Sequence, residues 1–134
     1  MTKFKASGYA KSIEYANKGL RIAVKSQRNF RFQLCFSILV VLMAVFLKFS
    51  LIEMCLIVFA IGFVLVAELF NSVIEFALDA LYRNKKNTLV GMAKDMSAGA
   101  VLVATCCAVI IGAILFSNKL FDLLIPGYYW FYGI

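Results

Sequence analysis

Three long apolar segments alternate with short polar ones along most of the chain, at residues 32–47, 54–81 and 96–116. A helix needs about 20 apolar residues to cross the hydrocarbon core of a bilayer. The second segment exceeds this length, and its surplus lies at its C-terminal end, where charged residues begin. The pattern predicts an all-α integral membrane protein with three transmembrane helices.

Composition supports the same class, because 63% of the 134 residues are apolar whereas soluble domains stay near one half. A chain of this length has room for one domain, so residues 1–134 are expected to form a single membrane-embedded unit. The sequence contains no histidine, which removes the usual catalytic triads and histidine metal sites. The four cysteines lie within apolar segments and are interpreted as packing residues.

Basic residues are concentrated at the N-terminus and between the last two apolar segments. Eight lysines and arginines occur within residues 1–31, and four more occur within residues 83–94. In a chain this apolar, the positive-inside rule explains both groups better than nucleic-acid binding does. The rule predicts a cytoplasmic N-terminus, spanning helices within residues 32–116, and an external tail at residues 117–134 whose aromatic residues form an interfacial belt.

The polar segment at residues 9–27 has a helical period. Apolar side chains such as Tyr9, Ile13 and Leu20 recur at helical spacing, while basic side chains occupy much of the remaining surface. This pattern is typical of an amphipathic surface helix that lies in the membrane interface. An ordinary surface helix packed on a neighbouring helix is the alternative.

Acidic residues form a stripe near the end of the second apolar segment, in AELFNSVIEFALDAL. At 100° per residue, Glu68, Glu75 and Asp79 fall close to one line along the helix, and Asn71 and Ser72 flank it. An acidic side chain in a membrane span costs roughly 2.5 kcal/mol or more, so the stripe indicates a function. Hard oxygen ligands suit Mg²⁺, which would relieve the repulsion among the carboxylates. A structural polar seam or an ion path remains open for the stripe.

A second polar group, AKDMSAGAVL, introduces the third apolar segment. Lys94 and Asp95 are predicted at the N-terminal end of that helix, where free N–H groups and the helix dipole attract anions. Lys94 adds a point charge suited to phosphate. Together with the stripe, this set has the parts of a phosphoryl-transfer centre, although no P-loop or kinase-type glycine loop is present.

The chain resembles the prokaryotic diacylglycerol kinase family, which includes undecaprenol kinases. The blocks that carry the resemblance are KGLR, NFR, AELFNSVIEFALDAL and AKDMSAGAVL, in the family's order and spacing. The resemblance implies a homotrimer in the bacterial inner membrane, with active sites between subunits at the cytoplasmic interface. It also implies Mg²⁺–ATP as the phosphoryl donor and diacylglycerol or undecaprenol as the acceptor lipid.

The resemblance further implies a role for each matching residue. Glu68 matches the general base that takes the proton of the lipid hydroxyl, and Ser72 and Asn71 are expected beside it near the lipid substrate. Glu75 matches a metal-binding glutamate. Four further matches are residues that line the site, with Lys94 on the nucleotide phosphates: Asn71, Asp79, Lys94 and Asp95. Of these, Asn71, Lys94 and Asp95 are expected to be catalytic together with Glu68. Tyr15 matches an aromatic residue near the nucleotide, where Glu75, Asp79, Lys94 and Asp95 are also expected.

Gln27 departs from the family pattern, which has a metal-binding glutamate at this position. Glutamine keeps an oxygen ligand but loses the negative charge that helps to hold Mg²⁺. Three explanations are open: a natural variant with another ligand, an engineered inactive form, or a relative that binds lipid or nucleotide without turnover. Gln33 is a weaker departure, because many members of one branch of the family carry histidine near that position.

Overall fold

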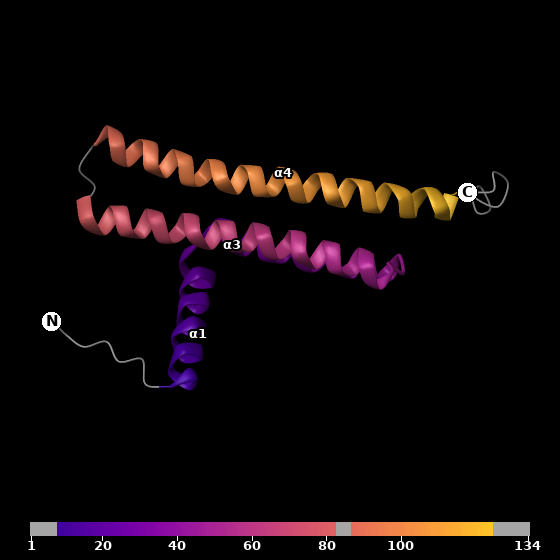
Figure 1. The fold of residues 1–134 in the computed structure, drawn as a ribbon, viewed down its shortest axis with the longest axis horizontal. Coiled ribbons are helices and arrows are strands. Elements are labelled where there is room, and N and C mark those ends of the chain that lie inside the picture. Colours follow the sequence, from indigo (N-terminus) through magenta and orange to yellow (C-terminus); the bar gives the residue numbers. More distant parts are fainter. Residues whose placement is uncertain (1–7, 83–86, 125–134) are drawn as a thin grey trace.

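The computed structural model describes residues 8–82 and 87–124, apart from the side chain of Asp122. These residues form helices joined by short connections, with no strand in the described ranges, so the predicted all-α class is confirmed. Figure 1 shows α3 and α4 running side by side over most of their length, with α1 extending crosswise from them. The helices are α1 (Tyr9–Ser26), α2 (Arg28–Phe46), α3 (Leu51–Tyr82) and α4 (Thr88–Leu124).

Three of these helices are long and apolar enough to cross a membrane, as predicted: α2, α3 and the Thr88–Phe121 part of α4. The predicted bounds of the last helix, residues 96–116, are too narrow at both ends. The helix continues past the charged side chains near its ends, because such residues indicate where the hydrocarbon core of the membrane ends and not where the helix ends. The predicted external tail is therefore helical as far as Leu124, and its aromatic cluster lies outside the described residues.

Gln27 separates α1 from α2 because its backbone is extended, with φ −100° and ψ 111°. The Arg31 guanidinium reaches back across this junction, where Nη1 donates to the carbonyl oxygens of Val24 and Lys25, each at 3.1 Å. These carbonyls belong to the last turn of α1, which has no further helical N–H groups to satisfy them. Arg31 therefore ties the end of α1 to the first turn of α2. Whether α1 lies in a membrane interface remains a prediction.

The turn between α2 and α3 is closed by reciprocal hydrogen bonds. The Ser50 backbone N–H donates to Glu53 Oε2 at 2.6 Å, and the Glu53 N–H donates to Ser50 Oγ at 3.4 Å. This is the capping-box arrangement that satisfies the free N–H groups at a helix start. It allows a short connection, so α3 returns antiparallel to α2 as predicted.

The same turn is attached to the far end of α4. Lys119 Nζ lies 3.7 Å from Glu53 Oε2, and the rings of Phe49 and Phe116 pack with centroids 4.8 Å apart. The two contacts fix the register of α4 against α3 at the end opposite to the acidic stripe.

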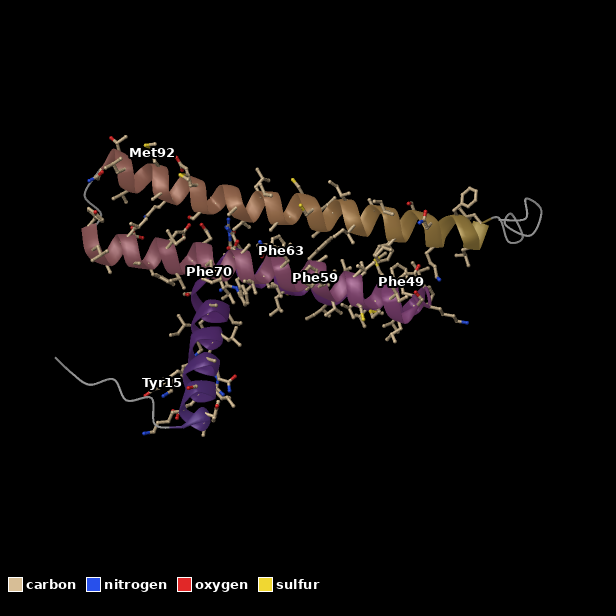
Figure 2. All side chains as sticks on the ribbon, viewed as in Figure 1. Tyr15, Phe49, Phe59, Phe63, Phe70 and Met92 are labelled. Carbon is tan, nitrogen blue, oxygen red and sulfur yellow. The ribbon has the colours of Figure 1, made fainter. Side chains whose placement is uncertain are left out.

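Alanines make up most of the buried apolar residues of the described helices. Ala44, Ala60 and Ala104 are all buried, with Ala104 only 1% exposed. Small side chains let backbones approach in lipid, where close packing replaces the hydrophobic effect as a driving force. Most large apolar side chains instead point outward, among them Phe59, Phe63 and Phe70 (Figure 2).

Ala104→Leu is expected to weaken the packing of α3 against α4. Overpacking of a well-filled contact costs about 1–3 kcal/mol, and Ala104 has almost no exposed surface. Unfolding of the purified protein from detergent micelles, titrated with a denaturing detergent, measures the loss. Val103→Leu is the matched control, because Val103 is 63% exposed and should tolerate the larger side chain. Equal unfolding midpoints for the two variants would contradict this view of the interface.

Candidate active site between the third and fourth helices

Polar side chains are buried where α3 faces its neighbours, in the region of the predicted acidic stripe. Glu68, Asn71 and Ser72 on α3 and Ser97 on α4 are each less than 9% exposed. They are the buried polar or charged side chains of the described residues. Three of the four were predicted as site residues. Because they are buried between helices, these three do not point into lipid.

Glu68 is held from α2. The Gln33 side-chain amide donates from Nε2 to Glu68 Oε2 at 3.3 Å. The other amide atom of Gln33, Oε1, is buried and has no hydrogen-bond partner within the described part of the chain. A buried acceptor without a partner is uncommon in folded proteins. The Gln33 amide therefore donates from Nε2 to the Glu68 carboxylate, and its Oε1 can accept a hydrogen bond from a further donor.

Asn71 links α4 to the next acidic residue of the stripe. Its Oδ1 accepts a hydrogen bond from Ser97 Oγ at 2.6 Å, and its Nδ2 donates to Glu75 Oε1 at 3.3 Å. A continuous polar path thus runs from α4 through Asn71 to Glu75. Glu75 is partly exposed and keeps its second carboxylate oxygen outside this bond.

Lys94 forms an ion pair across the α3–α4 interface with Asp79, which lies about one turn beyond Glu75 on α3. Both side chains are partly exposed, at 34% and 45%. The pair places a cation and a carboxylate beside the buried polar cluster. The Asp95 side chain is exposed and makes no hydrogen bond or ion pair with another described residue.

One part of the sequence interpretation is wrong. Lys94 and Asp95 do not stand at the start of the last helix, because α4 begins at Thr88. Asn87 caps that start, with its Oδ1 accepting from the Leu89 N–H at 2.9 Å. The sequence interpretation began the helix at the long apolar segment, whereas the first two turns of α4 precede that segment. The free N–H groups and dipole of a helix end are therefore about two turns away from Lys94, whose own charge remains the feature suited to phosphate.

Two predicted residues take no part in the hydrogen bonds of this polar set. Tyr15 is 56% exposed on α1, and Figure 2 places it well away from α3 and α4. Its ring contacts Lys18, with Nζ 5.6 Å from the centroid. Gln27 lies at the α1–α2 junction and is partly buried. The structure of one chain therefore does not bring Tyr15 to Glu68.

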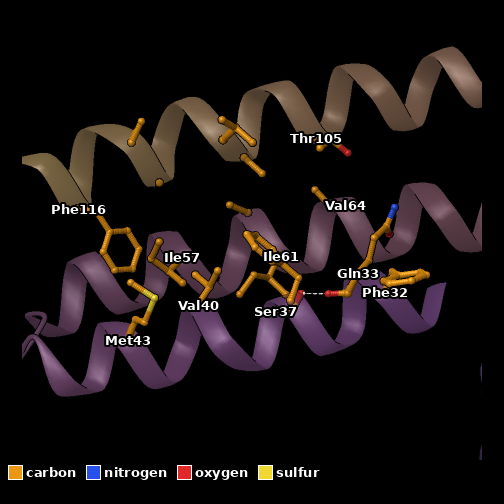
Figure 3. Close-up of a pocket in the computed structure, with 16 residues that line it drawn as sticks. Phe32, Gln33, Ser37, Val40, Met43, Ile57, Ile61, Val64, Thr105 and Phe116 are labelled. Atoms are coloured by element: carbon orange, nitrogen blue, oxygen red, sulfur yellow. Dashed lines mark hydrogen bonds between the residues drawn. The ribbon is translucent and has the colours of Figure 1, made fainter. Parts of the chain in front are cut away.

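An apolar groove of about 680 Å³ opens between α2 and α4, with α3 as its floor. Figure 3 shows Gln33 at one end of it and Phe116 at the other. Two further polar residues, Ser37 and Thr105, line it, but their hydroxyls donate to carbonyls of their own helices at 2.7 and 2.8 Å. Gln33, the partner of Glu68, therefore supplies the groove's available polar group.

Charged pairs mark the two ends of the α3–α4 interface. Glu53 pairs with Lys119 at one end and Asp79 with Lys94 at the other. Lys94 and Lys119 are 25 residues apart in one helix, or about 37 Å at the rise of an α-helix. No charged residue occurs between Asp95 and Lys119, so a hydrocarbon core of about 30 Å fits between the pairs. The buried cluster lies toward the Asp79–Lys94 end.

Comparison with known proteins identifies the family. The sequence pattern of the prokaryotic diacylglycerol kinase family matches residues 14–116. The chain belongs to this family. The family consists of lipid kinases, and the protein is an enzyme of that class.

Individual relatives agree with the assignment. The undecaprenol kinase of Bacillus subtilis is 34% identical over 112 residues, which cover 84% of this chain and 90% of the relative. The diacylglycerol kinase of Escherichia coli is 35% identical over 105 residues, covering 78% and 85% of the two chains. The diacylglycerol kinase of Synechocystis is 32% identical over 114 residues, covering 85% of this chain and 65% of that protein.

Two residues that donate hydrogen bonds to Glu68 and Asn71 were not predicted as site residues. Ser97 lies one turn after Lys94 in the same block, and its spacing could have indicated a shared helix face. Gln33 was noted only as a departure from the family, and nothing in its local sequence indicates a partner 35 positions away.

Proposed function

We propose that the protein transfers the γ-phosphoryl group of ATP to the hydroxyl of a membrane lipid alcohol at the cytoplasmic face of a bacterial inner membrane. The observation that carries this proposal is the position of Glu68. Its carboxylate is buried and accepts a hydrogen bond from Gln33, which lines one end of the apolar groove. On its other side, the hydrogen-bonded set of Asn71, Glu75 and Ser97 continues toward Lys94. This is where an alcohol on a lipid chain could meet an anionic nucleotide.

The acceptor is proposed to be diacylglycerol or undecaprenol, because relatives are named for each. The apolar groove supports an acceptor with long hydrocarbon chains. With the chain in the groove, the hydroxyl would lie near Gln33 and Glu68. Gln33 holds the carboxylate in place through its Nε2, which leaves the other carboxylate oxygen to face the hydroxyl.

In the reaction, Glu68 accepts the hydroxyl proton as the lipid oxygen attacks the γ-phosphorus. The new bond joins the lipid oxygen to phosphorus, and the bond between that phosphorus and the β,γ-bridging oxygen breaks. ADP leaves with the electron pair of the broken bond. Ser72 and Asn71, buried beside Glu68, line the substrate side of the site.

Magnesium is implied by the family, and the donor set is compatible with it. The described residues include no group of three or more histidine, cysteine, aspartate or glutamate side chains that could hold a metal. Mg²⁺ in phosphoryl-transfer sites is usually held by one or two carboxylates plus substrate phosphates and water. Glu75 supplies one carboxylate with an oxygen free of the Asn71 bond, and Gln27 would supply an amide oxygen. When bound, the ion neutralises charge on the phosphates.

The nucleotide phosphates are proposed to lie beside Lys94, which would exchange its Asp79 contact for phosphate oxygens. Asp79 and Asp95 line this partly exposed end of the site. Tyr15 is proposed to contact the nucleotide from α1 of another chain. Its distance from the cluster within one chain supports active sites shared between the subunits of a homotrimer.

A phosphorylation assay tests the proposed reaction directly. The purified protein in mixed micelles is given Mg²⁺ and γ-labelled ATP with diacylglycerol or undecaprenol, and labelled lipid is measured. We expect transfer to at least one lipid, and the ratio of the two rates identifies the preferred acceptor. Absence of labelled product from both lipids would contradict the proposal.

Glu68→Gln is expected to lower turnover by roughly 10²–10⁴-fold, the usual contribution of a general base. The amide has the same size but cannot take the proton, so folding should be kept. Turnover and unfolding midpoint are measured together. Glu53→Gln is the matched control on the same helix, because glutamine also serves in a capping box and Glu53 lies at the opposite end of α3. Normal turnover in Glu68→Gln would show that Glu68 is not the general base.

Gln27→Glu is expected to strengthen magnesium binding, because a carboxylate adds the negative charge that an amide lacks. The Mg²⁺ concentration for half-maximal activity should fall. Ser26→Glu adds the same charge one residue away, where the native hydroxyl bonds only to the Ile22 carbonyl of its own helix. If the two variants respond alike, or neither changes the magnesium dependence, residue 27 is not a ligand in this protein.

A further inference from the structure

Ser97 is a buried hydroxyl of α4 that points at the polar face of α3. It is 8% exposed, and its Oγ lies 2.6 Å from Asn71 Oδ1 and 2.8 Å from the Lys94 carbonyl oxygen. A serine hydroxyl carries one proton and donates to one acceptor at a time. Many serine and threonine hydroxyls in helices donate only to a carbonyl of their own helix, as Thr105 does in α4. Ser97 differs because its shorter contact crosses to another helix.

The contact fixes which way the Asn71 amide faces. With Oδ1 engaged by Ser97, the Nδ2 atom is directed at Glu75 Oε1, where it donates at 3.3 Å. If the amide turned over, its oxygen would face the Glu75 carboxylate, two acceptors without a proton between them. The Ser97 proton therefore stabilises the orientation in which Asn71 holds one oxygen of Glu75.

We propose that Ser97 is a positioning residue for nucleotide-bound magnesium, acting through Asn71 on Glu75. This inference rests on the proposed function and deepens it. Glu75 presents its remaining oxygen in a fixed direction only while Asn71 holds the other one. Asn71 is held in turn from α4, the helix that also carries Lys94. One helix thus sets both the direction of the carboxylate and the place of the phosphate-binding cation.

The position of Ser97 along α4 supports this coupling. Ser97 follows Lys94 by three residues, so both side chains lie on the face of α4 that meets α3. The two contacts across the interface, Ser97–Asn71 and Lys94–Asp79, are about one turn apart on α4. A rotation of α4 that displaced one would displace the other.

The experiment compares Ser97→Ala, which lacks the hydroxyl, with Ser97→Thr, which keeps it. Ser117→Ala is the matched control, because it removes a hydroxyl of the same helix that donates to the Ile114 carbonyl of that helix and lies outside the groove. Binding of Mn²⁺, as a spectroscopic substitute for Mg²⁺, is measured by electron paramagnetic resonance with a non-hydrolysable ATP analogue. The KM values for ATP and for lipid are measured in parallel, and the unfolding midpoint checks that each variant is folded.

Ser97→Ala is expected to weaken Mn²⁺ binding by roughly 10-fold, the usual effect of removing a residue that orients a metal ligand. The KM for ATP should rise with it, and the KM for lipid should not change. Ser97→Thr should restore binding, and Ser117→Ala should resemble the unsubstituted protein. In an Asn71→Ala background, Ser97→Ala should have little further effect, because the path to Glu75 is already broken.

Unchanged Mn²⁺ binding in folded Ser97→Ala would overturn the inference. An additive loss in the Asn71→Ala background would also overturn it, since Ser97 would then act by another route. The binding measurement needs no turnover, so the two proposals can fail separately. Absence of lipid phosphorylation contradicts the proposed function, whereas Mn²⁺ binding that does not depend on Ser97 contradicts only its positioning role.

Discussion

The packing of α3 against α4 is the interaction on which the rest of the structure depends. In lipid a buried polar group has no water to bond with, so a helix that carries acidic and amide side chains must find partners on its neighbours. Glu68 and Asn71 find them in Gln33 of α2 and Ser97 of α4. The groups proposed to act on substrate therefore also specify how the helices pack, and α3 cannot rotate without leaving a carboxylate or an amide unsatisfied.

The same packing sets where two dissimilar substrates can meet. The apolar groove reaches Gln33 from the hydrocarbon side, while the Asp79–Lys94 pair lies at the partly exposed end of the interface. Glu68, Asn71 and Glu75 occupy the helix turns between these regions. A lipid alcohol could approach from the hydrocarbon side and a triphosphate from the aqueous side. The lipid chain would then stay in the membrane and the triphosphate in water. No long lid or separate nucleotide domain is needed for such an arrangement.

Sequence reasoning predicted the parts of this structure that hydropathy and helical period encode. Three spanning helices, the tight antiparallel turn and the clustering of Glu68, Asn71 and Ser72 follow from spacing within single segments. The start of α4 was not predicted correctly, because the sequence of the short basic stretch before the Asn87 cap is typical of a loop. Gln33 and Ser97 were missed for a different reason: their roles come from contacts between helices, which depend on register and rotation rather than on local pattern.

The direction of α1 has a consequence for how a complete site could form. Arg31 ties the last turn of α1 to α2 at the extended Gln27, so α1 leaves the bundle crosswise and carries Tyr15 away from its own α3. In the proposed homotrimer, a side chain held outward in this way would reach the polar cluster of a neighbouring molecule. The many exposed aromatic side chains of α3 leave room for such a neighbour to pack in the membrane. On this geometry, the extended backbone of Gln27 sets the direction of α1, while its side chain is a candidate metal ligand. Its backbone conformation would then matter for assembling the site even where its side chain contributes little to metal binding.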